Sequence, residues 1–283
     1  MKRFTKVLIT TLAAAAAFAA VPAGSANAQE IQLTGPLKGA PAVRRLRLYR
    51  AGRFEIAPSF TATLLDEYRR TLLVGARLNY GITDWLGIGA WGAFGAIGVS
   101  TSLTDQIDQN AQRSGLTQMN VPATGQFKNQ VAQIGYIVMP QLTAVPFRGK
   151  FALFQSVFAD VDAYLFAGFG VVGTKERADC NSFITCAQNH DLASKTHLAP
   201  TWGLGFNFYL NKFIGLGFEY RMIPFAWNRS GFDSRGLSAD NTPDASGKFP
   251  DGKIDEKDQT YRFNQMLSIF IGFSFPTTPK ITD

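Results

Sequence analysis

The sequence predicts an all-β fold, an eight-stranded antiparallel transmembrane β-barrel of the outer-membrane type. Only 17% of the 283 residues are charged while 46% are hydrophobic, whereas about 25% charged residues are usual in a soluble domain. The 24 Phe, 27 Gly and 8 Tyr favour closely approaching strands over helices. The apolar residues occur in short pieces, and no uninterrupted apolar run reaches the roughly 18 residues of a transmembrane helix.

The first 28 residues have the three parts of a secretory signal peptide: a basic start, an apolar stretch over Val7–Ala20, and small residues at Ala26 and Ala28. An apolar stretch of about 14 residues is too short to cross a hydrocarbon core about 30 Å thick, which argues against a lone anchoring helix. We therefore expect export to the outer membrane of a Gram-negative bacterium. The expected parts are the signal at 1–28, a periplasmic segment at 29–51, the barrel at 52–276 and a periplasmic tail at 277–283.

Part of the positive charge belongs to this export signal. The whole chain has a net charge of +7, and removal of the three basic residues of the signal leaves about +4. This modest charge gives little support to nucleic-acid binding, and an exported protein rarely meets nucleic acid. We expect no nucleic-acid partner.

Among the first four expected strands, the first two separate their two faces clearly, and the third is the weakest. In 54–62 and 72–80, apolar residues alternate with charged, polar or glycine residues, which is the strand signature. The third, about 84–100, is apolar throughout from Trp85 to Val99, and its five glycines argue against a helix. The fourth, about 133–144, is readable with less contrast.

The last four expected strands end in the clearest one. The fifth, about 160–173, has little contrast, whereas 198–210 alternates large apolar residues with glycine and small polar ones. The seventh, 214–222, follows after only Asn211 and Lys212, which predicts a hairpin. The eighth, 263–275, has a nearly unbroken apolar face opposite a small and polar one.

Short and long connections alternate in phase with a membrane barrel. Those after the second and sixth strands are tiny, that after the fourth is moderate, and those after the third, fifth and seventh are long and polar; the first is short. Outer-membrane barrels have short periplasmic turns and longer extracellular loops. Strands of roughly 11 to 16 residues also satisfy the requirement of about 9 to 11 residues for a crossing. Both chain ends are therefore expected in the periplasm.

The charged residues of the strands share the glycine-rich face. In a soluble barrel that face would meet water, and the opposite face would carry more Phe than one interior could hold. A membrane barrel explains both faces. Because an eight-stranded barrel has an interior just wide enough for side chains, we predict a salt-bridge network that plugs the lumen. Its expected members are Glu55, Arg77, Asp162, Glu219 and Arg221.

Three stretches of the chain resemble the outer membrane β-barrel domain family of myxobacterial type. They are GAPAVRRLRLYRAGRFEIAPSFTATLLDEYRRTLLVGARLNYGITDWLGIGAWGAFG from Gly39 to Gly95, MPQLTAVPFRGKFALF from Met139 to Phe154, and DAYLFAGFGVV from Asp162 to Val172. The architecture is more loosely similar to the small OmpA/OmpX-type barrels. The family is defined by its barrel and has no assigned activity, so the resemblance implies fold and location and transfers no functional residues.

Cys180 and Cys186 are expected to form a disulfide, because an exported chain meets oxidising conditions. Zinc would need two further ligands, and the nearby His190 and His197 match no standard ligand spacing. We expect no metal site here and no cofactor.

Catalysis of the barrel deacylase type would need a His, a Ser and a carboxylate aligned on the outer wall. The chain has two histidines, position 199 is Ala, and Ser194 is an ordinary loop serine. We interpret His197 as a polar residue at the mouth of a strand, and we predict no catalytic residue and no enzyme.

The last long loop resembles a calcium loop in part, because DGKIDEKD places a glycine, an isoleucine and acidic oxygens together. Aligning Gly252 to the turn leaves Gly247 and Phe249 where oxygen ligands belong. A solvated acidic loop is the favoured interpretation, and a calcium site at Asp251, Asp255 and Asp258 is the alternative.

A basic run of Arg44, Arg45, Arg47 and Arg50 precedes the first strand on the expected periplasmic side. Its two interpretations are contact with lipid phosphates and a solvated, unpaired tail, since surface charge alone names no ligand.

Three functions are compatible with these patterns. The first is a non-enzymatic surface protein with a structural role or a recognition role carried by its extracellular loops. The second is a narrow conduit for small or apolar solutes, and the third is a lipid-modifying enzyme. The expected partners are outer-membrane lipids and the barrel-assembly machinery, the expected state is a monomer, and the sequence names no extracellular ligand.

Overall fold

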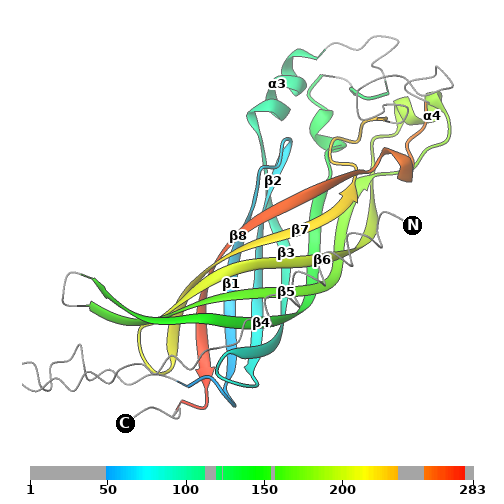
Figure 1. Ribbon diagram of the computed structural model, residues 1–283. Helices are drawn as coiled ribbons and strands as arrows, with labels where there is room; N and C mark the ends of the chain where they lie inside the picture. Colours follow the sequence, from blue (N-terminus) through cyan, green and yellow to red (C-terminus); the bar gives the residue numbers. More distant parts are fainter. Residues whose placement is uncertain (1–48, 112–118, 123, 154–156, 235–251, 278–283) are drawn as a thin grey trace, which may run out of the picture. The chain divides into compact units, whose positions relative to one another are not determined.

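A computed structural model describes residues 49–111, 119–122, 124–153, 157–234 and 252–277. Eight strands form a closed antiparallel barrel in which each pairs with its neighbours in sequence and β1 closes on β8 (Figure 1). The strands are β1 (Phe54–Leu64), β2 (Arg69–Gly81), β3 (Leu86–Ser100), β4 (Gln133–Leu153), β5 (Val157–Arg177), β6 (Leu192–Tyr209), β7 (Ile214–Trp227) and β8 (Thr260–Phe275). Every expected strand is present.

The two faces of the strands meet different surroundings, as the alternation predicts. Along β8, Leu267, Ile269 and Ile271 are 42%, 47% and 45% exposed, whereas the intervening Ser268 is 1% exposed. The outside of the barrel is therefore apolar and the polar side chains of the strands lie inside. This distribution is the reverse of a soluble barrel and is that of a transmembrane one.

The connections divide between the two ends of the barrel. One end has the short turns at 82–85 and 210–213, and the other has the connections at 65–68, 101–132, 178–191 and 228–259. The long connections contain α3 (Ser102–Asn110), η1 (Phe127–Asn129), α4 (Phe183–Gln188) and η2 (Glu256–Asp258). Figure 1 places α3 and α4 at the same end, which we call the long-loop end.

None of the helices in the described parts of the chain is both long enough and apolar enough to cross a membrane.

The connection between β4 and β5 differs from its prediction. A moderate loop was expected between residues 144 and 160, but the two strands continue to Leu153 and from Val157. β3 pairs with β4 as far as Ala144, and β6 pairs with β5 from Asp160. The expected strand ends therefore mark the edge of the barrel wall, and beyond it β4 and β5 continue as a two-stranded ribbon. A ribbon is not enclosed by a wall, so its sequence need not keep two contrasting faces.

Two seams interrupt the ladder toward the long-loop end. Pairing of β6 with β7 ends at Trp202 and Met222, and pairing of β3 with β4 ends at Phe94 and Tyr136. In both cases the strands continue beyond the last pair. The barrel wall therefore separates there into β4–β5–β6 and β7–β8–β1–β2–β3.

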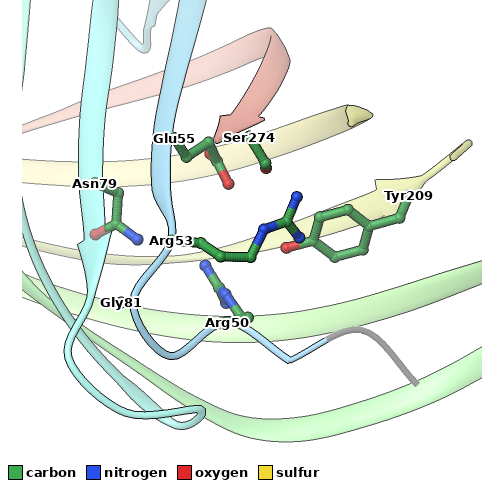
Figure 2. Close-up of a pocket in the computed structure, with 7 residues that line it drawn as sticks. All are labelled: Arg50, Arg53, Glu55, Asn79, Gly81, Tyr209 and Ser274. Carbon is green, nitrogen blue, oxygen red and sulfur yellow. The ribbon is translucent and has the colours of Figure 1, made fainter. Parts of the chain in front are cut away.

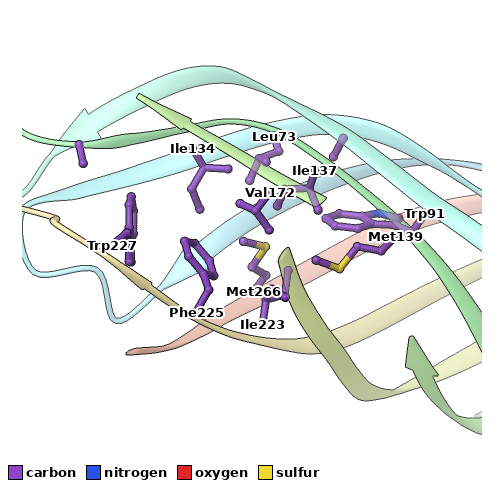
Figure 3. Packing of buried hydrophobic residues seen from close by; sticks show 13 residues of the cluster. Leu73, Trp91, Ile134, Ile137, Met139, Val172, Ile223, Phe225, Trp227 and Met266 are labelled. Atoms are coloured by element: carbon purple, nitrogen blue, oxygen red, sulfur yellow. The ribbon is translucent and has the colours of Figure 1, made fainter. Parts of the chain in front are cut away.

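The lumen holds an apolar layer that the sequence did not predict. Trp91, Met139, Ile223 and Met266 are at most 1% exposed and pack together inside the wall (Figure 3). Trp91 comes from the stretch that is apolar on both faces, so alternation gave no sign of its direction. This apolar layer lies toward the long loops, and the charged strand residues predicted for the lumen lie closer to the short turns.

Candidate functional site

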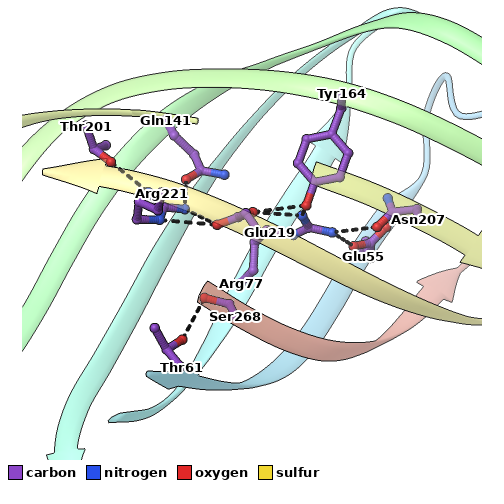
Figure 4. A network of polar contacts seen from close by, with 10 residues as sticks. All are labelled: Glu55, Thr61, Arg77, Gln141, Tyr164, Thr201, Asn207, Glu219, Arg221 and Ser268. Carbon is purple, nitrogen blue, oxygen red and sulfur yellow. Dashed lines mark hydrogen bonds and ion pairs between the residues drawn. The ribbon is translucent and has the colours of Figure 1, made fainter. Parts of the chain in front are cut away.

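The charged lumen layer is centred on Arg77 of β2. Its Nη2 lies 2.5 Å from Oε1 of Glu55 on β1, and its Nη1 lies 3.2 Å from Oε2 of Glu219 on β7. Nη1 also donates to the hydroxyl of Tyr164 on β5. That hydroxyl donates in turn to Oε2 of Glu219 at 3.0 Å. One arginine thus joins four strands across the interior (Figure 4).

Arg221 of β7 extends this layer toward the apolar one. Its Nη2 lies 2.6 Å from Oε1 of Glu219 and 2.8 Å from Oε1 of Gln141, and its Nη1 donates to Oγ1 of Thr201 at 3.1 Å. The chain Glu55, Arg77, Glu219 and Arg221 contains two acids and two bases, all at most 7% exposed. Its formal charges therefore cancel, as burial in a low-dielectric interior requires.

Aromatic rings cover both guanidinium groups. The Arg77 guanidinium lies 4.0 Å from the centre of the Phe270 ring, and that of Arg221 lies 4.2 Å from Phe166 and 4.4 Å from Trp91. Such cation–π contacts stabilise a desolvated cation by about 2 kcal/mol. Rings and ion pairs together explain how this interior tolerates two full charges of each sign.

Glycines on the inner face leave the space that these rings fill. A Cβ on Gly217 would lie 2.0 Å from the ring of Phe270, and one on Gly205 would lie 2.4 Å from the ring of Tyr164. Alternation identifies the glycine-rich face, but it does not indicate the rings that this face accommodates. Each glycine faces a large ring on a neighbouring strand.

Asp162 is not part of this network, which corrects the prediction that grouped it with the other four. Its Oδ2 lies 3.4 Å from Nη1 of Arg50, and its Oδ1 lies 3.7 Å from Nε of Arg148. These partners come from the segment before β1 and from the β4 ribbon, neither of which was expected to reach the lumen. Arg148 and Asp162 are direct neighbours across the β4–β5 ladder, a register that alternation alone does not reveal.

Arg50 is the described member of the basic run, and it enters the barrel mouth instead of forming a solvated tail. It is 9% exposed, and its backbone N–H donates to Oδ1 of Asp84 at 2.7 Å. Arg53, 7% exposed, lies beside it and donates from Nη2 to the carbonyl of Lys212 at 2.6 Å. Figure 2 shows both guanidinium groups next to the ring of Tyr209. Residues 44, 45 and 47 lie outside the described residues.

A second arrangement of polar contacts lies at the long-loop end. Cys180 and Cys186 form the expected disulfide. Beside it, Arg177 is 1% exposed and donates to the backbone carbonyls of Met119 and Gly231, both at 2.7 Å, and to that of Cys186. These carbonyls belong to the three long connections, which we call together the loop cap. Arg177 was not singled out from the sequence, because backbone acceptors leave no residue pattern.

His197 lies inside the wall near the cap and not on the outer surface. Its Nε2 is 2.6 Å from Oε1 of Glu176 and 3.0 Å from Oγ1 of Thr174. A catalytic relay uses the two ring nitrogens for two different partners, whereas here one nitrogen contacts both. Oε2 of Glu176 also accepts from the N–H of Asn228 at 3.0 Å, which ties β5 to the end of β7. The geometry is that of a structural bridge.

The residues considered for metals have other contacts. His190 Nε2 lies 3.2 Å from the carbonyl of Ala187. Asp255 and Asp258 form a capping box around η2, in which each carboxylate accepts a backbone N–H. Asp251 lies outside the described residues. Among those described, no cluster of three or more His, Cys, Asp or Glu side chains is placed to hold a metal ion.

No protein-family model matches this chain, and no curated protein matches it in sequence. Among solved structures, the chain is similar to the N-terminal β-barrel domain of OprF from Pseudomonas aeruginosa, with 10% identity and a TM-score of 0.41 over 80% of this chain and 98% of that one. It is also similar to Ail, the attachment invasion locus protein of Yersinia pestis, with 10% identity and a TM-score of 0.32 over 80% and 99%. Neisserial surface protein A gives 9% identity and a TM-score of 0.33 over 78% and 93%.

Because these identities and scores are low, we transfer no residue and no activity from these proteins. The resemblance to small OmpA/OmpX-type barrels agrees with the ring of eight strands described above. The resemblance to the myxobacterial family stays a prediction.

Proposed function

We propose that this chain is a non-enzymatic outer-membrane β-barrel that closes its own lumen and presents the loop cap outside the cell as a structural or recognition surface. The observation that carries the proposal is the distribution of side chains across the wall, apolar outside and filled with packed rings and ion pairs inside. A wall of this kind fits lipid on its outer side. The packed rings and ion pairs inside support a closed lumen.

The outer wall supports the membrane location. Val74, Phe94, Leu142 and Phe169 are between 52% and 69% exposed on four different strands. An exposed apolar surface that encircles a barrel is far larger than the patches that soluble monomers tolerate. In this orientation the short turns face the periplasm and the loop cap faces outward, as short and long connections do in outer-membrane barrels.

The loop cap supports a surface role. Arg177 joins its three connections through their backbone carbonyls, and the disulfide closes a short loop within one of them. On it, Phe183 and Ile184 of α4 are 42% and 70% exposed beside the disulfide. Apolar groups held on a braced loop are suited to contact a partner, because little conformational entropy is lost on binding.

A narrow conduit is the second candidate, and the seams favour it. The ladder between β6 and β7 ends at Trp202 and Met222. Beyond it, the rings of His197 on β6 and Phe225 on β7 lie 5.3 Å apart between their centres. Small apolar solutes could enter the bilayer through such a seam without crossing the charged layer. A liposome uptake assay with small apolar and small polar solutes distinguishes this route from a closed barrel.

The proposal is tested with the purified full chain. We expect a heat-modifiable band in the outer-membrane fraction, cleavage of the cap by protease added to intact cells, and little or no ion conductance in planar bilayers. We expect a leak only when the charge network is broken, as in Arg221→Ala. Recovery as a soluble periplasmic protein would refute the membrane location, and steady ion-selective channels from the unmodified protein would refute the closed lumen.

A further inference from the structure

A small cavity opens at the short-turn end of the barrel, outside the charged layer described above (Figure 2). It is lined by Arg50, Arg53, Asn79, Tyr209 and Ser274, with Glu55 at its inner side. The lining thus combines two guanidinium groups with two hydroxyls and a side-chain amide. All of these groups can donate hydrogen bonds.

Arg53 has a donor that the protein leaves unused, and Arg50 has only a long contact to its carboxylate. Arg53 gives Nη2 to the carbonyl of Lys212, but its buried Nε has no hydrogen-bond partner among the residues that the structure describes. Arg50 reaches Asp162 at a long 3.4 Å between Nη1 and Oδ2. A buried charged donor without an acceptor is costly. An acceptor supplied from outside would remove that cost.

The nearby carboxylates are already engaged. Glu55 lies 2.5 Å from Arg77, and Asp162 shares its charge between Arg50 and Arg148. The residues that line the cavity therefore carry two formal positive charges, on Arg50 and Arg53, and one negative charge, on Glu55.

We propose that a phosphate group binds at the open mouth of this cavity, on the guanidinium groups of Arg50 and Arg53. Two guanidinium forks and the adjacent hydroxyls offer several divergent donors, which suits a tetrahedral oxyanion with oxygens on all sides better than a planar carboxylate. The phosphate can belong to a free phosphate compound or to a lipid headgroup at the mouth. Its assignment to the periplasmic side rests on the proposed function, whereas the binding chemistry does not.

The test uses the folded full chain in a zwitterionic detergent without phosphate groups. Inorganic phosphate is titrated by calorimetry, and one parallel titration uses dihexanoyl phosphatidic acid while another uses dihexanoyl phosphatidylcholine, which has no net charge. Arg53-dependent binding of inorganic phosphate assigns the site to free phosphate compounds. Arg53-dependent binding of phosphatidic acid alone assigns it to lipid headgroups.

The deciding variant is Arg53→Gln, for which we expect phosphate affinity to fall about ten- to hundredfold, as the loss of a charged hydrogen bond predicts. The matched control is Lys212→Gln, which removes an exposed cation beside the mouth but outside the cavity and should leave the affinity within about twofold. If Arg53→Gln does not fold, Tyr209→Phe provides the second variant, with an expected loss of about three- to tenfold.

If the unmodified protein binds neither inorganic phosphate nor phosphatidic acid, or if the wild type and Arg53→Gln bind with equal affinity, the site is overturned. These results are independent of conductance and of location in the cell, so failure here is distinguishable from failure of the proposed function.

Discussion

The lumen network and the loop cap each bury an arginine almost completely, yet they satisfy it in opposite ways. Arg221 donates to side chains carried by three strands, whereas Arg177 donates to backbone carbonyls from three connecting segments. In the wall, strand pairing already satisfies the backbone hydrogen-bonding groups, so the buried side chains need only balance each other's charges. Among the described residues of the cap, Cys180 and Ile254 form an isolated bridge and no ladder, so the side chain of Arg177 joins the three connections.

This difference predicts how far the destabilising effect of a substitution extends through the molecule. A change in the lumen leaves a charge without its partner in a low-dielectric interior, which affects the whole barrel. A change in the cap releases loop carbonyls that water can reach, so its effect stays local. The following substitutions test that distinction, from the largest expected effect to the smallest.

The largest effect is expected for Arg221→Ala. It removes one of the two cations that contact Glu219, and we expect the free energy of unfolding to fall by about 3 to 5 kcal/mol. Urea titration of the barrel in detergent, followed by the gel shift of the folded form, measures this. Arg70→Ala, at an exposed position on β2, is the control and should change stability by no more than about 0.5 kcal/mol.

A double variant separates lost contact from stranded charge. Arg221→Met combined with Glu219→Gln removes one cation and one anion and leaves Arg77 paired with Glu55. If stranded charge is the cause, the double variant should recover at least about 2 kcal/mol relative to the single change. A double variant as unstable as Arg221→Ala would mean that packing against the rings of Phe166 and Trp91 dominates.

Arg177→Ala should loosen the cap and spare the barrel. Loss of its charged hydrogen bonds is expected to reduce the local opening free energy by about 2 to 3 kcal/mol. Limited proteolysis should then cut the long loops roughly 30- to 150-fold faster, while the gel shift of the folded barrel is retained. Loss of barrel assembly in this variant would remove the distinction between the two regions.

Cys180→Ser should have a smaller effect of the same local kind. The closed loop is short, so chain entropy limits its contribution to about 2 to 3 kcal/mol at most, and mainly to local order. We expect normal barrel assembly and a moderate increase in cap proteolysis. Mass spectrometry of the wild type without reductant should find no free thiol, and two free thiols would contradict the bridge.

The smallest effect is expected for Tyr164→Phe. The ring stays against Gly205, and only the hydroxyl between Arg77 and Glu219 is lost. We expect a destabilisation of about 1 kcal/mol, typical of one hydrogen bond whose partners remain paired. The same urea titration measures it, and a loss as large as that of Arg221→Ala would show that the hydroxyl holds the network together.

The sequence predicted the features that follow from strand geometry. Alternation, together with the glycine content of the third strand, located the eight strands. It also pointed Glu55, Arg77, Glu219 and Arg221 inward, where the structure brings them together. This succeeds because the side chains of a strand alternate between its two faces, and one face of each strand in a membrane barrel contacts lipid. In the β4–β5 ribbon this requirement does not apply, and there the predicted strand ends were wrong.

The contacts that were missed have a different physical origin. Asp162 pairs with Arg50 from outside the strands, and Arg177 binds backbone atoms that are the same in every residue. Trp91 lies in a stretch that is apolar on both faces, so hydropathy does not indicate its direction. In each case the contact depends on a neighbour in space that is far away in the sequence or that leaves no residue pattern.

The glycines opposite Tyr164 and Phe270 have a consequence for the divergence of such chains. Volume on the inner wall is shared between two strands, so a larger residue at Gly205 or Gly217 is tolerated only when the facing ring becomes smaller. The outer wall has no such partner, since lipid adapts to any apolar shape. Inner positions should therefore be substituted in compensating pairs, whereas outer positions should be substituted independently. The inner faces of two related barrels should then stay similar in sequence after their outer faces have diverged.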